Sequence, residues 1–421
     1  MHSMSYKKII GTLIFFISCF NSPILGFNDE EVIDIRGFNY GRLQIAFNVE
    51  KSPGSEDQQL EKTVELLKRN LMWSGLFDIK DIFDKYDLVL KIRYVPRNEI
   101  RVWIYSPDNT LLFDHRRPVS DENELQPAAI KMVEEIIFQL TGERSILRSA
   151  IAYVEKDQSD RYRILLTDAF GEKRFILIDD NNFNILPRWK PNASALLFTT
   201  LGQQGSHLRQ YDFKSGTITT LFKNLNKLSG GSWSHTGEHL VITKSIDGNS
   251  DLFKINLKGE IVEQLTFRSS TEANPRLSPD GKRLLFVSNR SGSIQIYQRI
   301  LDTRETFRMT FEGNLNVEPN WSNDGAYIVF SGLKDNVYQI FLMDKEGDFV
   351  QQITYGNHSA EQPVWAPNGR QVLFVSKINY DQKLFVIRAD GTYKRRLTQS
   401  GPGINEFNPT WSEHYKWPAG N

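Results

Sequence analysis

A segment of about 44 residues repeats along most of the chain, and no other feature restricts the possible fold as strongly. Residues 275–288 read P-R-L-S-P-D-G-K-R-L-L-F-V-S, and related stretches begin 44 residues later at Pro319, another 44 later at Pro363, and 44 earlier at Gly231. Two further copies begin at Pro187 and Pro409. A constant period of this length is typical of a repeat architecture in which each copy forms one supersecondary unit.

Each copy carries the signals for four short strands. A P-x-W-S segment is followed by a turn such as Asp280-Gly281, which supplies the positive φ of a tight hairpin, and then by an apolar strand. Three columns spaced by 44 residues stay apolar through six copies: Val154, Phe198, Ile242, Phe286, Phe330 and Phe374; Ile164, Leu208, Leu252, Ile296, Ile340 and Leu384; Leu177, Leu221, Leu265, Met309, Ile353 and Leu397. This pattern predicts the four-stranded blades of a β-propeller.

The two ends of the repeat region complement each other. The first apolar strand, from Ile151, has no P-x-W-S segment before it, and the last such segment, residues 409–412, has no apolar strand after it. We therefore expect the two segments to share one sheet. This closes a ring of six blades with strands from both ends and removes two sheet edges that would otherwise be exposed.

The region before the repeats predicts a small α+β domain. Residues 41–49, 88–94, 101–105 and 111–113 alternate as strands. Two helices are expected, one over residues 56–70 with an apolar face that includes Leu60 and Leu67, and one from about residue 124 to Gly142. Helices and strands mixed in this way over residues 38–147 favour an α+β fold.

The N-terminus has the pattern of a secretory signal peptide. Lys7 and Lys8 precede an apolar run over residues 9–20, which is short for a membrane-spanning helix. An uncleaved membrane anchor is the alternative. The only cysteine, Cys19, lies in this segment behind a poor lipobox, so we expect a mature chain without disulfides, held by its apolar cores. The 51 basic and 51 acidic residues balance, which disfavours long-range attraction to nucleic acid.

Residue sets that carry enzyme chemistry are not found in the sequence. There is no G-x-S-x-G elbow, no phosphate-binding loop and no G-x-G-x-x-G fingerprint. His235 and His239 have the spacing of helical zinc ligands, but a turn separates them. A tryptophan in five of the six copies, with Leu277 in the sixth, favours packing between blades over ligand stacking: Trp189, Trp233, Trp321, Trp365 and Trp411. We therefore assign no catalytic residue, no cofactor and no metal.

The segments that lead into the P-x-W-S strands are the expected binding surface, because loops on a rigid scaffold are where partners bind. Four of these segments carry an acid shortly before the proline: Glu272, Glu318, Glu361 and Glu406. Two interpretations remain open. The carboxylates are either solvated loop groups, or they form an acidic rim that meets basic or amide groups of a protein partner.

The order of these features resembles the TolB family, the periplasmic propeller proteins of the Tol-Pal system of Gram-negative bacteria. Besides the blades, two stretches carry the resemblance, N-L-M-W-S-G-L-F at residues 70–77 and L-T-G-E-R-S-I-L-R-S-A-I-A-Y-V at 140–154. The resemblance implies a monomeric, non-enzymatic, periplasmic protein that links the outer-membrane lipoprotein Pal with the inner-membrane protein TolA. It also implies a role in outer-membrane integrity and in invagination during cell division.

Carried over by position, the resemblance implies a domain order of signal peptide (1–26), N-terminal arm (27–37), α+β domain (38–147) and propeller (148–421). The residues implied to face Pal are Thr271, Glu272, Ala273, Asn274, Val317 and Glu318, with Glu361 and Glu406 extending the rim. The arm implied to bind TolA comprises Phe27, Asn28, Asp29, Glu30, Glu31, Val32, Ile33, Asp34 and Ile35.

Two other function classes fit a propeller. A lactonase-like hydrolase with a metal in the central channel would need several Asp, Asn, Glu or His ligands that converge on the axis. A carbohydrate-binding propeller would need exposed aromatic side chains on its loops, for which the sequence offers Phe183, Phe267, Phe311, Tyr355 and Phe407.

Overall fold

The structure, a computed structural model, describes residues 42–50, 57–95, 99–119, 121–203, 205–225, 229–246, 249–267, 270–413, 415 and 417. Two compact units are distinguished, the first ending at Ser145 and the second running from Ile146 and also including Trp73–Leu76. The expected signal peptide and N-terminal arm lie outside the described residues. Among the described helices, none has the length and apolar character needed to span a bilayer.

The first unit is a five-stranded mixed sheet with two helices. Its strand order is β2 (Phe77–Lys80), β1 (Leu43–Glu50), β3 (Leu88–Val95), β4 (Glu99–Tyr105) and β5 (Leu111–Pro118). β1 pairs in parallel with β2 and β3, whereas β3, β4 and β5 form an antiparallel meander. The α+β prediction is confirmed. β2 was missed, because four residues are too few to show a period.

Both predicted helices of the first unit are present, as α1 (Asp57–Trp73) and α2 (Glu122–Thr141). Leu60 and Leu67 of α1 are buried, as the apolar spacing predicts. Asp121 caps the N-terminus of α2, and its carboxylate accepts the backbone N–H groups of Asn123 and Glu124. It ends at Gly142, which adopts φ 68° and donates its N–H to the carbonyl of Phe138.

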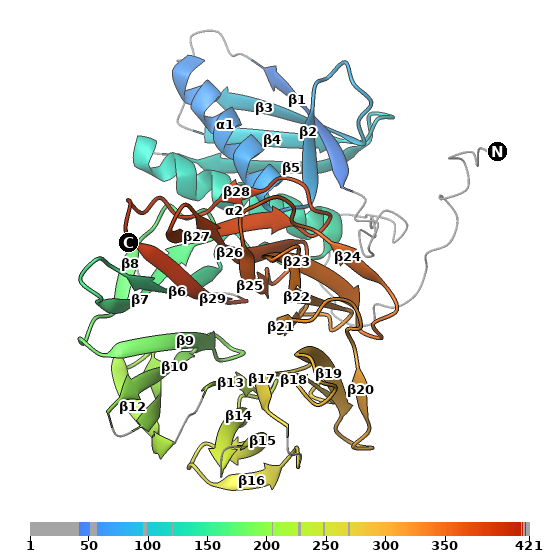
Figure 1. Cartoon of the computed structure of the whole chain (residues 1–421). Helices are drawn as coiled ribbons and strands as arrows, with labels where there is room; N and C mark the ends of the chain where they lie inside the picture. The colour runs from blue at the N-terminus through green and yellow to red at the C-terminus, as the bar shows by residue number, and fades with distance from the viewer. Residues whose placement is uncertain are drawn as a thin grey trace, which may run out of the picture. The chain divides into compact units, whose positions relative to one another are not determined.

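The second unit is a propeller of six four-stranded sheets over the described residues (Figure 1). Blade 1 consists of β29 (Asn405–Trp411), β6 (Ala150–Lys156), β7 (Tyr162–Asp168) and β8 (Phe175–Ile178). Blade 2 holds β9 (Phe183–Trp189), β10 (Ala195–Gly202), β11 (Gly205–Asp212) and β12 (Thr217–Leu225). Blade 3 holds β13 (Ser229–Trp233), β14 (His239–Ile246), β15 (Asn249–Asn256) and β16 (Ile261–Gln264).

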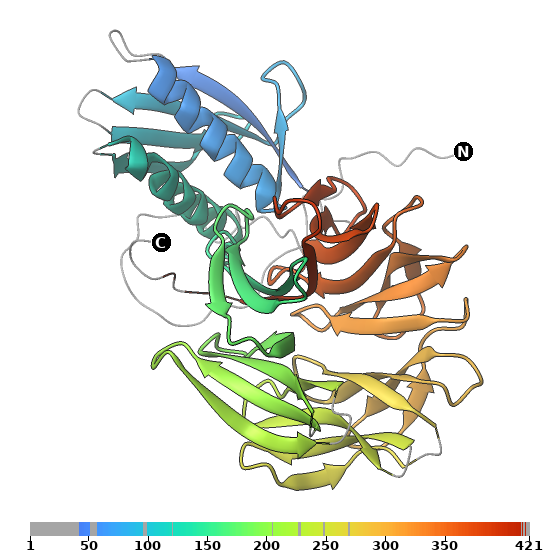
Figure 2. The ribbon, with the colours of Figure 1, turned by 60° about the vertical axis from the view of Figure 1, so that its left-hand side comes forward.

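The remaining three blades follow in chain order, so that in both ribbon views the colour runs round the ring from green through yellow to red (Figure 2). Blade 4 holds β17 (Glu272–Leu277), β18 (Arg283–Ser288), β19 (Gln295–Ile300) and β20 (Thr306–Arg308). Blade 5 holds β21 (Asn316–Trp321), β22 (Tyr327–Lys334), β23 (Val337–Asp344) and β24 (Val350–Gln352). Blade 6 holds β25 (Ala360–Trp365), β26 (Gln371–Ile378), β27 (Asp381–Arg388) and β28 (Arg395–Arg396).

The ring closes as the sequence predicts, with β29, the last strand of the propeller, beside β6, its first strand (Figure 1). Trp411 lies opposite Ile151 and Thr410 opposite Ala152. Beyond the ladder, the backbone N–H of Ala150 donates to the hydroxyl of Ser412 at 2.8 Å, and Nε1 of Trp411 donates to the hydroxyl of Ser149 at 2.6 Å. Both bonds are buried and join residues 262 positions apart.

One of the three apolar columns is wrong by one residue in blade 1. In blades 2 and 6, the phenylalanine of this column, Phe198 or Phe374, lies opposite the two residues where the register of the inner strand shifts, 186–187 or 362–363. In blade 1 that place belongs to Tyr153, whereas Val154 pairs with Phe407 and Ile164. The step from the first copy is therefore not 44 residues in this column. Tyr153 and Val154 are both buried, so apolar character alone did not reveal the offset.

The tryptophans pack between blades, as predicted. Trp189, Trp233, Trp321, Trp365 and Trp411 are at most 8% exposed. Nε1 of Trp189 donates to the carbonyl of Thr410, and Nε1 of Trp321 donates to the carbonyl of Arg276, each at 3.2 Å. Both acceptors belong to the inner strand of another blade. The tryptophans thus join blades through packing and hydrogen bonds.

Gly171 allows a close approach between blade 1, which we also call the closing sheet, and blade 6. It follows β7 with φ +77°, and a Cβ at this position would lie 1.9 Å from the carbonyl oxygen of Leu397. Gly292 also has a positive φ, of +88°, but a Cβ there would meet nothing within 4 Å. Gly292→Ala therefore carries the cost of the backbone conformation alone, whereas Gly171→Ala adds a clash with backbone.

We expect Gly171→Ala to lower the free energy of unfolding by at least about 2 kcal/mol more than Gly292→Ala does. Chemical denaturation of both full-length variants measures this difference. Equal destabilisation would show that the closing sheet tolerates displacement at this contact.

Candidate functional site: the two mouths of the propeller channel

The six inner strands surround the axis of the propeller. β9, β13, β17, β21, β25 and β29 each form one edge of their sheets, and each contacts the inner strand of the next blade round the ring. Their starts and ends therefore define two mouths of a central channel. We call the segments that lead into these strands the entry mouth (182–186, 270–274, 314–318, 358–362 and 404–408). The turns that follow them form the turn mouth (190–194, 234–238, 278–282, 322–326 and 366–370).

The residues predicted to face a partner gather at the entry mouth, but most of them lie in strands. Thr271 directly precedes β17, which contains Glu272, Ala273 and Asn274. Val317 and Glu318 belong to β21, whereas Glu361 lies in β25 and Glu406 in β29. The expectation that the four acids sit on long polar loops is thus wrong, since all four are inner-strand residues.

Glu272 holds blade 4 together from inside. Its side chain is 0% exposed, and Nη2 of Arg290 lies 2.6 Å from its Oε2. The hydroxyls of Ser270 and Ser288 donate to its Oε1 at 2.6 and 2.9 Å. Every strong interaction of this carboxylate is therefore internal. Removing one partner of such a buried pair is strongly destabilising, so the residue acts in the scaffold.

Glu406 has a similar internal role in the closing sheet. It is 1% exposed, accepts the hydroxyl of Thr398, and accepts the backbone N–H of Leu384 at 3.4 Å. Burial raises the pKa of Glu406, and the hydroxyl of Thr398 opposes that shift. The acidic-rim interpretation is wrong for Glu272 and Glu406. Glu361, by contrast, is half-buried and accepts the hydroxyl of Ser359.

Five inner strands share a bulge just before their proline. The residue before the proline has positive φ in each case, and the bulge residues together oppose a single residue of the neighbouring strand. Proline fits here because it has no N–H to lose from the ladder. The positive-φ residues are Leu186 (55°), Asn274 (52°), Glu318 (57°), Gln362 (56°) and Asn408 (49°).

The bulge turns backbone N–H groups away from the ladder, and side chains of neighbouring blades accept three of them. The N–H of Gln362 donates to Oε2 of Glu318 at 2.7 Å, and the N–H of Asn408 donates to Oε1 of Gln362 at 2.6 Å. The N–H of Leu186 donates to Oδ1 of Asn408 at 3.2 Å. We call Glu318, Gln362, Asn408 and Leu186 the axial chain. It links blades 5, 6, 1 and 2 around the channel.

Glu318 is the charged member of the axial chain. Burial raises its pKa, whereas the N–H of Gln362, the hydroxyl of Ser331 at 2.9 Å and the charge of Arg276 act in the opposite direction. The neighbouring charge of Glu361 adds to the increase. Glu318 is therefore both a structural acceptor and an acid in a channel that disfavours its ionised form.

Exposed aromatic side chains recur beside the entry mouth. Phe267, Phe311 and Tyr355 are 68%, 71% and 68% exposed and follow one another at steps of 44 residues. Each comes directly after a buried threonine that lies two residues beyond the outer strand of blade 3, 4 or 5. Phe183 is half exposed, whereas Phe407 is half-buried. The entry mouth therefore combines polar strand residues with an apolar arc on three consecutive blades.

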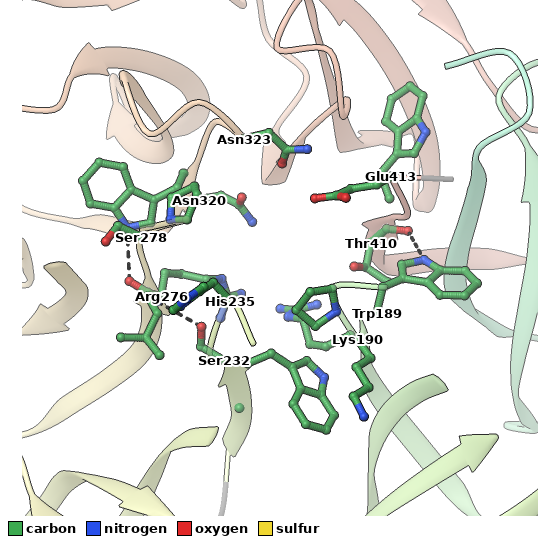
Figure 3. Close-up of a pocket in the computed structure, with 18 of the residues that line it drawn as sticks. Trp189, Lys190, Ser232, His235, Arg276, Ser278, Asn320, Asn323, Thr410 and Glu413 are labelled. Carbon is green, nitrogen blue, oxygen red and sulfur yellow. Dashed lines mark hydrogen bonds between the residues drawn. The ribbon is translucent and has the colours of Figure 1, made fainter. Parts of the chain in front are cut away.

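The turn mouth opens into a cavity of about 630 Å³, whose lining includes Arg188, Ser232 and Arg276 (Figure 3). Sequence reasoning did not single out these residues. The signal was nonetheless present, because the position after the inner-strand proline varies from blade to blade while its neighbours repeat: Arg188, Ser232, Arg276, Asn320, Val364 and Thr410.

No metal centre emerges from the residues that the structure describes, where His, Cys, Asp and Glu side chains form no group of three with suitable proximity. His235 belongs to a turn and His239 begins β14. The two histidines therefore do not lie on a helix, although their spacing is that of helical zinc ligands. The hydrolase alternative has no ligand set in this part of the chain.

Residues 138–415 match the family model of the TolB beta propeller domain. The chain belongs to the TolB family. Among curated relatives, the Tol-Pal system protein TolB of Anaeromyxobacter dehalogenans is 26% identical over 281 residues, which cover 60% of this chain and 64% of the relative. The TolB homolog of Chlorobium chlorochromatii is 29% identical over 161 residues, which cover 38% of this chain and 36% of the relative. The match thus spans less than two thirds of the length of these relatives.

A solved structure extends the similarity of fold beyond the propeller. The crystal structure of TolB from Acinetobacter baumannii superposes with a TM-score of 0.71 and covers 88% of this chain and 96% of its own, at 20% sequence identity. At this identity the likeness concerns the fold. The six-bladed propeller and the preceding α+β region are therefore the architecture of a TolB-family protein.

Glu318→Gln separates the structural role of this residue from its charge. The variant keeps an oxygen that can accept the N–H of Gln362 and the hydroxyl of Ser331, but it loses the ionisable group. Because the pKa of Glu318 is raised in the folded protein, the folded state binds the proton more readily than the unfolded state does. Its contribution to stability therefore improves as pH falls through the folded pKa towards the ordinary glutamate value.

We expect the wild type to become more stable relative to Glu318→Gln, in free energy of unfolding, as the pH falls from neutral towards the ordinary glutamate pKa of about 4.3. Denaturant titrations at several pH values measure the difference, in which the shared contributions of Glu406 and other acids cancel. Parallel pH profiles would contradict the raised pKa.

Proposed function

We propose that this TolB-family protein is a periplasmic, non-enzymatic, protein-binding component of a Tol-Pal system. It would link a Pal-like peptidoglycan-associated lipoprotein of the outer membrane with a TolA-like protein of the inner membrane, and so support outer-membrane integrity and invagination during division. The match of the family model to the propeller carries this proposal, together with relatives that are named Tol-Pal system proteins. The export pattern at the N-terminus supports the location.

The entry mouth is the proposed surface for the Pal-like lipoprotein. Thr271 is exposed, and Ala273, Asn274, Val317, Glu318 and Glu361 are half-buried, so their side chains are accessible to a partner. The exposed rings of Phe267, Phe311 and Tyr355 supply apolar area beside them. Aromatic anchors with a polar surround are typical of protein interfaces. Glu272 and Glu406 belong to this site as internal supports and not as contact groups.

The arm, residues 27–37, is the proposed surface for the TolA-like protein. The arm and the entry mouth are different segments of the chain, so each can bind its own partner. On this proposal, binding of one partner changes how readily the arm binds the other. Such coupling requires that the first partner have different affinities for the two states of the arm.

Replacement of Thr271 and Val317 by arginine should weaken binding of the Pal-like lipoprotein at least about tenfold, because both bulky charges would stand in the contact surface. Calorimetry with the purified lipoprotein domain measures the affinity. Asn323→Arg is the matched control, since Asn323 is exposed at the turn mouth. Unchanged affinity of the double variant would reject the entry mouth as the site.

Deletion of residues 27–37 should abolish binding to the TolA-like protein and leave the affinity for the Pal-like lipoprotein unchanged. The arm, on this proposal, supplies the contacts to TolA only. Pull-down of each partner with the mature full-length protein and the deletion variant measures both interactions. TolA binding retained by the deletion variant would contradict the role of the arm.

A further inference from the structure

The cavity at the turn mouth is rich in positive charge. Its Lys and Arg side chains are Arg188, Lys190 and Arg276, against the single acid Glu413, so that cationic groups number three and anionic groups one. Figure 3 shows Lys190, Arg276 and Glu413 around the same space. Lys190 additionally lies 5.7 Å above the ring of Trp233. Such a lining attracts anions and disfavours cations.

Arg188 and Arg276 occupy equivalent places in β9 and β17, two blades apart. Each is half-buried, and each donates Nη1 to the carbonyl of its own preceding proline, at 2.8 Å for Arg188 and 2.9 Å for Arg276. The same local bond therefore orients both guanidinium groups. Nε of each is buried and has no hydrogen-bond partner within the part of the chain that the structure describes.

The two charges are not neutralised by a neighbouring carboxylate. Among the described residues, neither arginine has an Asp or Glu oxygen within 4.0 Å. Burial lowers the pKa of Arg276 to about 10 and lowers the pKa of Arg188 well below its usual range, and the charge of Arg276 contributes to the latter shift. Glu318 acts in the opposite direction on both. Its Oε2, however, already accepts the N–H of Gln362 and the hydroxyl of Ser331.

The fold does not require a cation at these positions. The equivalent residues of the other blades are Ser232, Asn320, Val364 and Thr410, so the inner strand accepts small, polar and apolar side chains alike. Two half-buried guanidinium groups without a counter-ion are costly to a folded protein. An anion from outside the chain would offset that cost.

We propose that the turn-mouth cavity binds an oxyanion, a carboxylate or phosphate group of a small ligand, through Arg188 and Arg276. The planar fork of guanidinium donors matches both groups and gives charge-assisted hydrogen bonds. The amide of Asn320 offers a neutral donor in the same cavity, and the tryptophans of its wall leave apolar surface for the body of a ligand. This site does not depend on the proposed partners, because Arg188 and Arg276 are not among the residues assigned to them.

The test is a calorimetric titration of the full chain with two probes, inorganic phosphate and succinate, at constant ionic strength. We expect saturable binding of at least one probe, and the tighter probe identifies the source of the oxyanion. Arg188→Gln and Arg276→Gln should each weaken that binding at least about tenfold. Arg161→Gln is the matched control, because Arg161 is a propeller arginine paired with Asp179 outside the cavity.

Absence of saturable binding by the wild type would overturn the proposal, irrespective of how the variants fold. Equal binding by the wild type and both cavity variants would also overturn it, since the ion would then be an adventitious ion only. Should a glutamine variant fail to fold, Arg188→Lys and Arg276→Lys keep the charge but lose the fork, and weakened binding in these variants supports the proposal. A loss confined to Arg161→Gln would place the anion elsewhere.

Discussion

At the bulges of the inner strands, the backbone N–H before the proline needs a hydrogen-bond acceptor from outside its own sheet. The contacts between blades at the axis depend on these acceptors. The bulge takes the group out of its own sheet, and a buried N–H without a partner costs about as much as a lost hydrogen bond. Glu318, Gln362 and Asn408 provide acceptors from the neighbouring blade. The ring is thus held by polar bonds at the axis as well as by the apolar layers between blades. The axial chain ends at Leu186, whose side chain has no acceptor to offer.

This arrangement divides the polar residues of the channel into two groups. The carboxylates of Glu272 and Glu406 are buried and bonded to internal partners. Glu318 accepts the N–H of Gln362 but is only half-buried. An acidic side chain near the axis is therefore not always available to a ligand. Arg188 and Arg276 differ, because within the described part of the chain their guanidinium groups donate to the carbonyls of their own preceding prolines and to no carboxylate. A buried charged group whose hydrogen bonds are satisfied within the protein has a structural role. A buried charged group without such partners indicates a binding site for a ligand.

The architecture could be predicted from the sequence because each strand and turn signal occurs in several copies, so that one ambiguous copy does not change the assignment. Three apolar columns, each kept through six copies, and turns at fixed spacing define the blades, and the unmatched ends at Ile151 and Trp411 define the closure. The site was harder to predict. Whether Glu272 is solvated or buried depends on Arg290, 18 residues away, and the axial chain depends on side chains that meet across blades. Tyr153 took the place expected for Val154, because in this column the step from the first copy to Phe198 is 45 residues and not 44.

The closing sheet also sets an order of events for the folding of the chain. β6 is among the first propeller strands to be synthesised, yet its partner β29 contains some of the last described residues, and the bonds of Ala150 and Trp411 span 262 positions. Contacts of such sequence separation form slowly, because the ends of a long loop must meet before they gain any stabilisation. During synthesis this edge of β6 stays unpaired until β29 has been made. The propeller therefore cannot close in a truncated chain, because a chain that ends before β29 lacks the inner strand of blade 1.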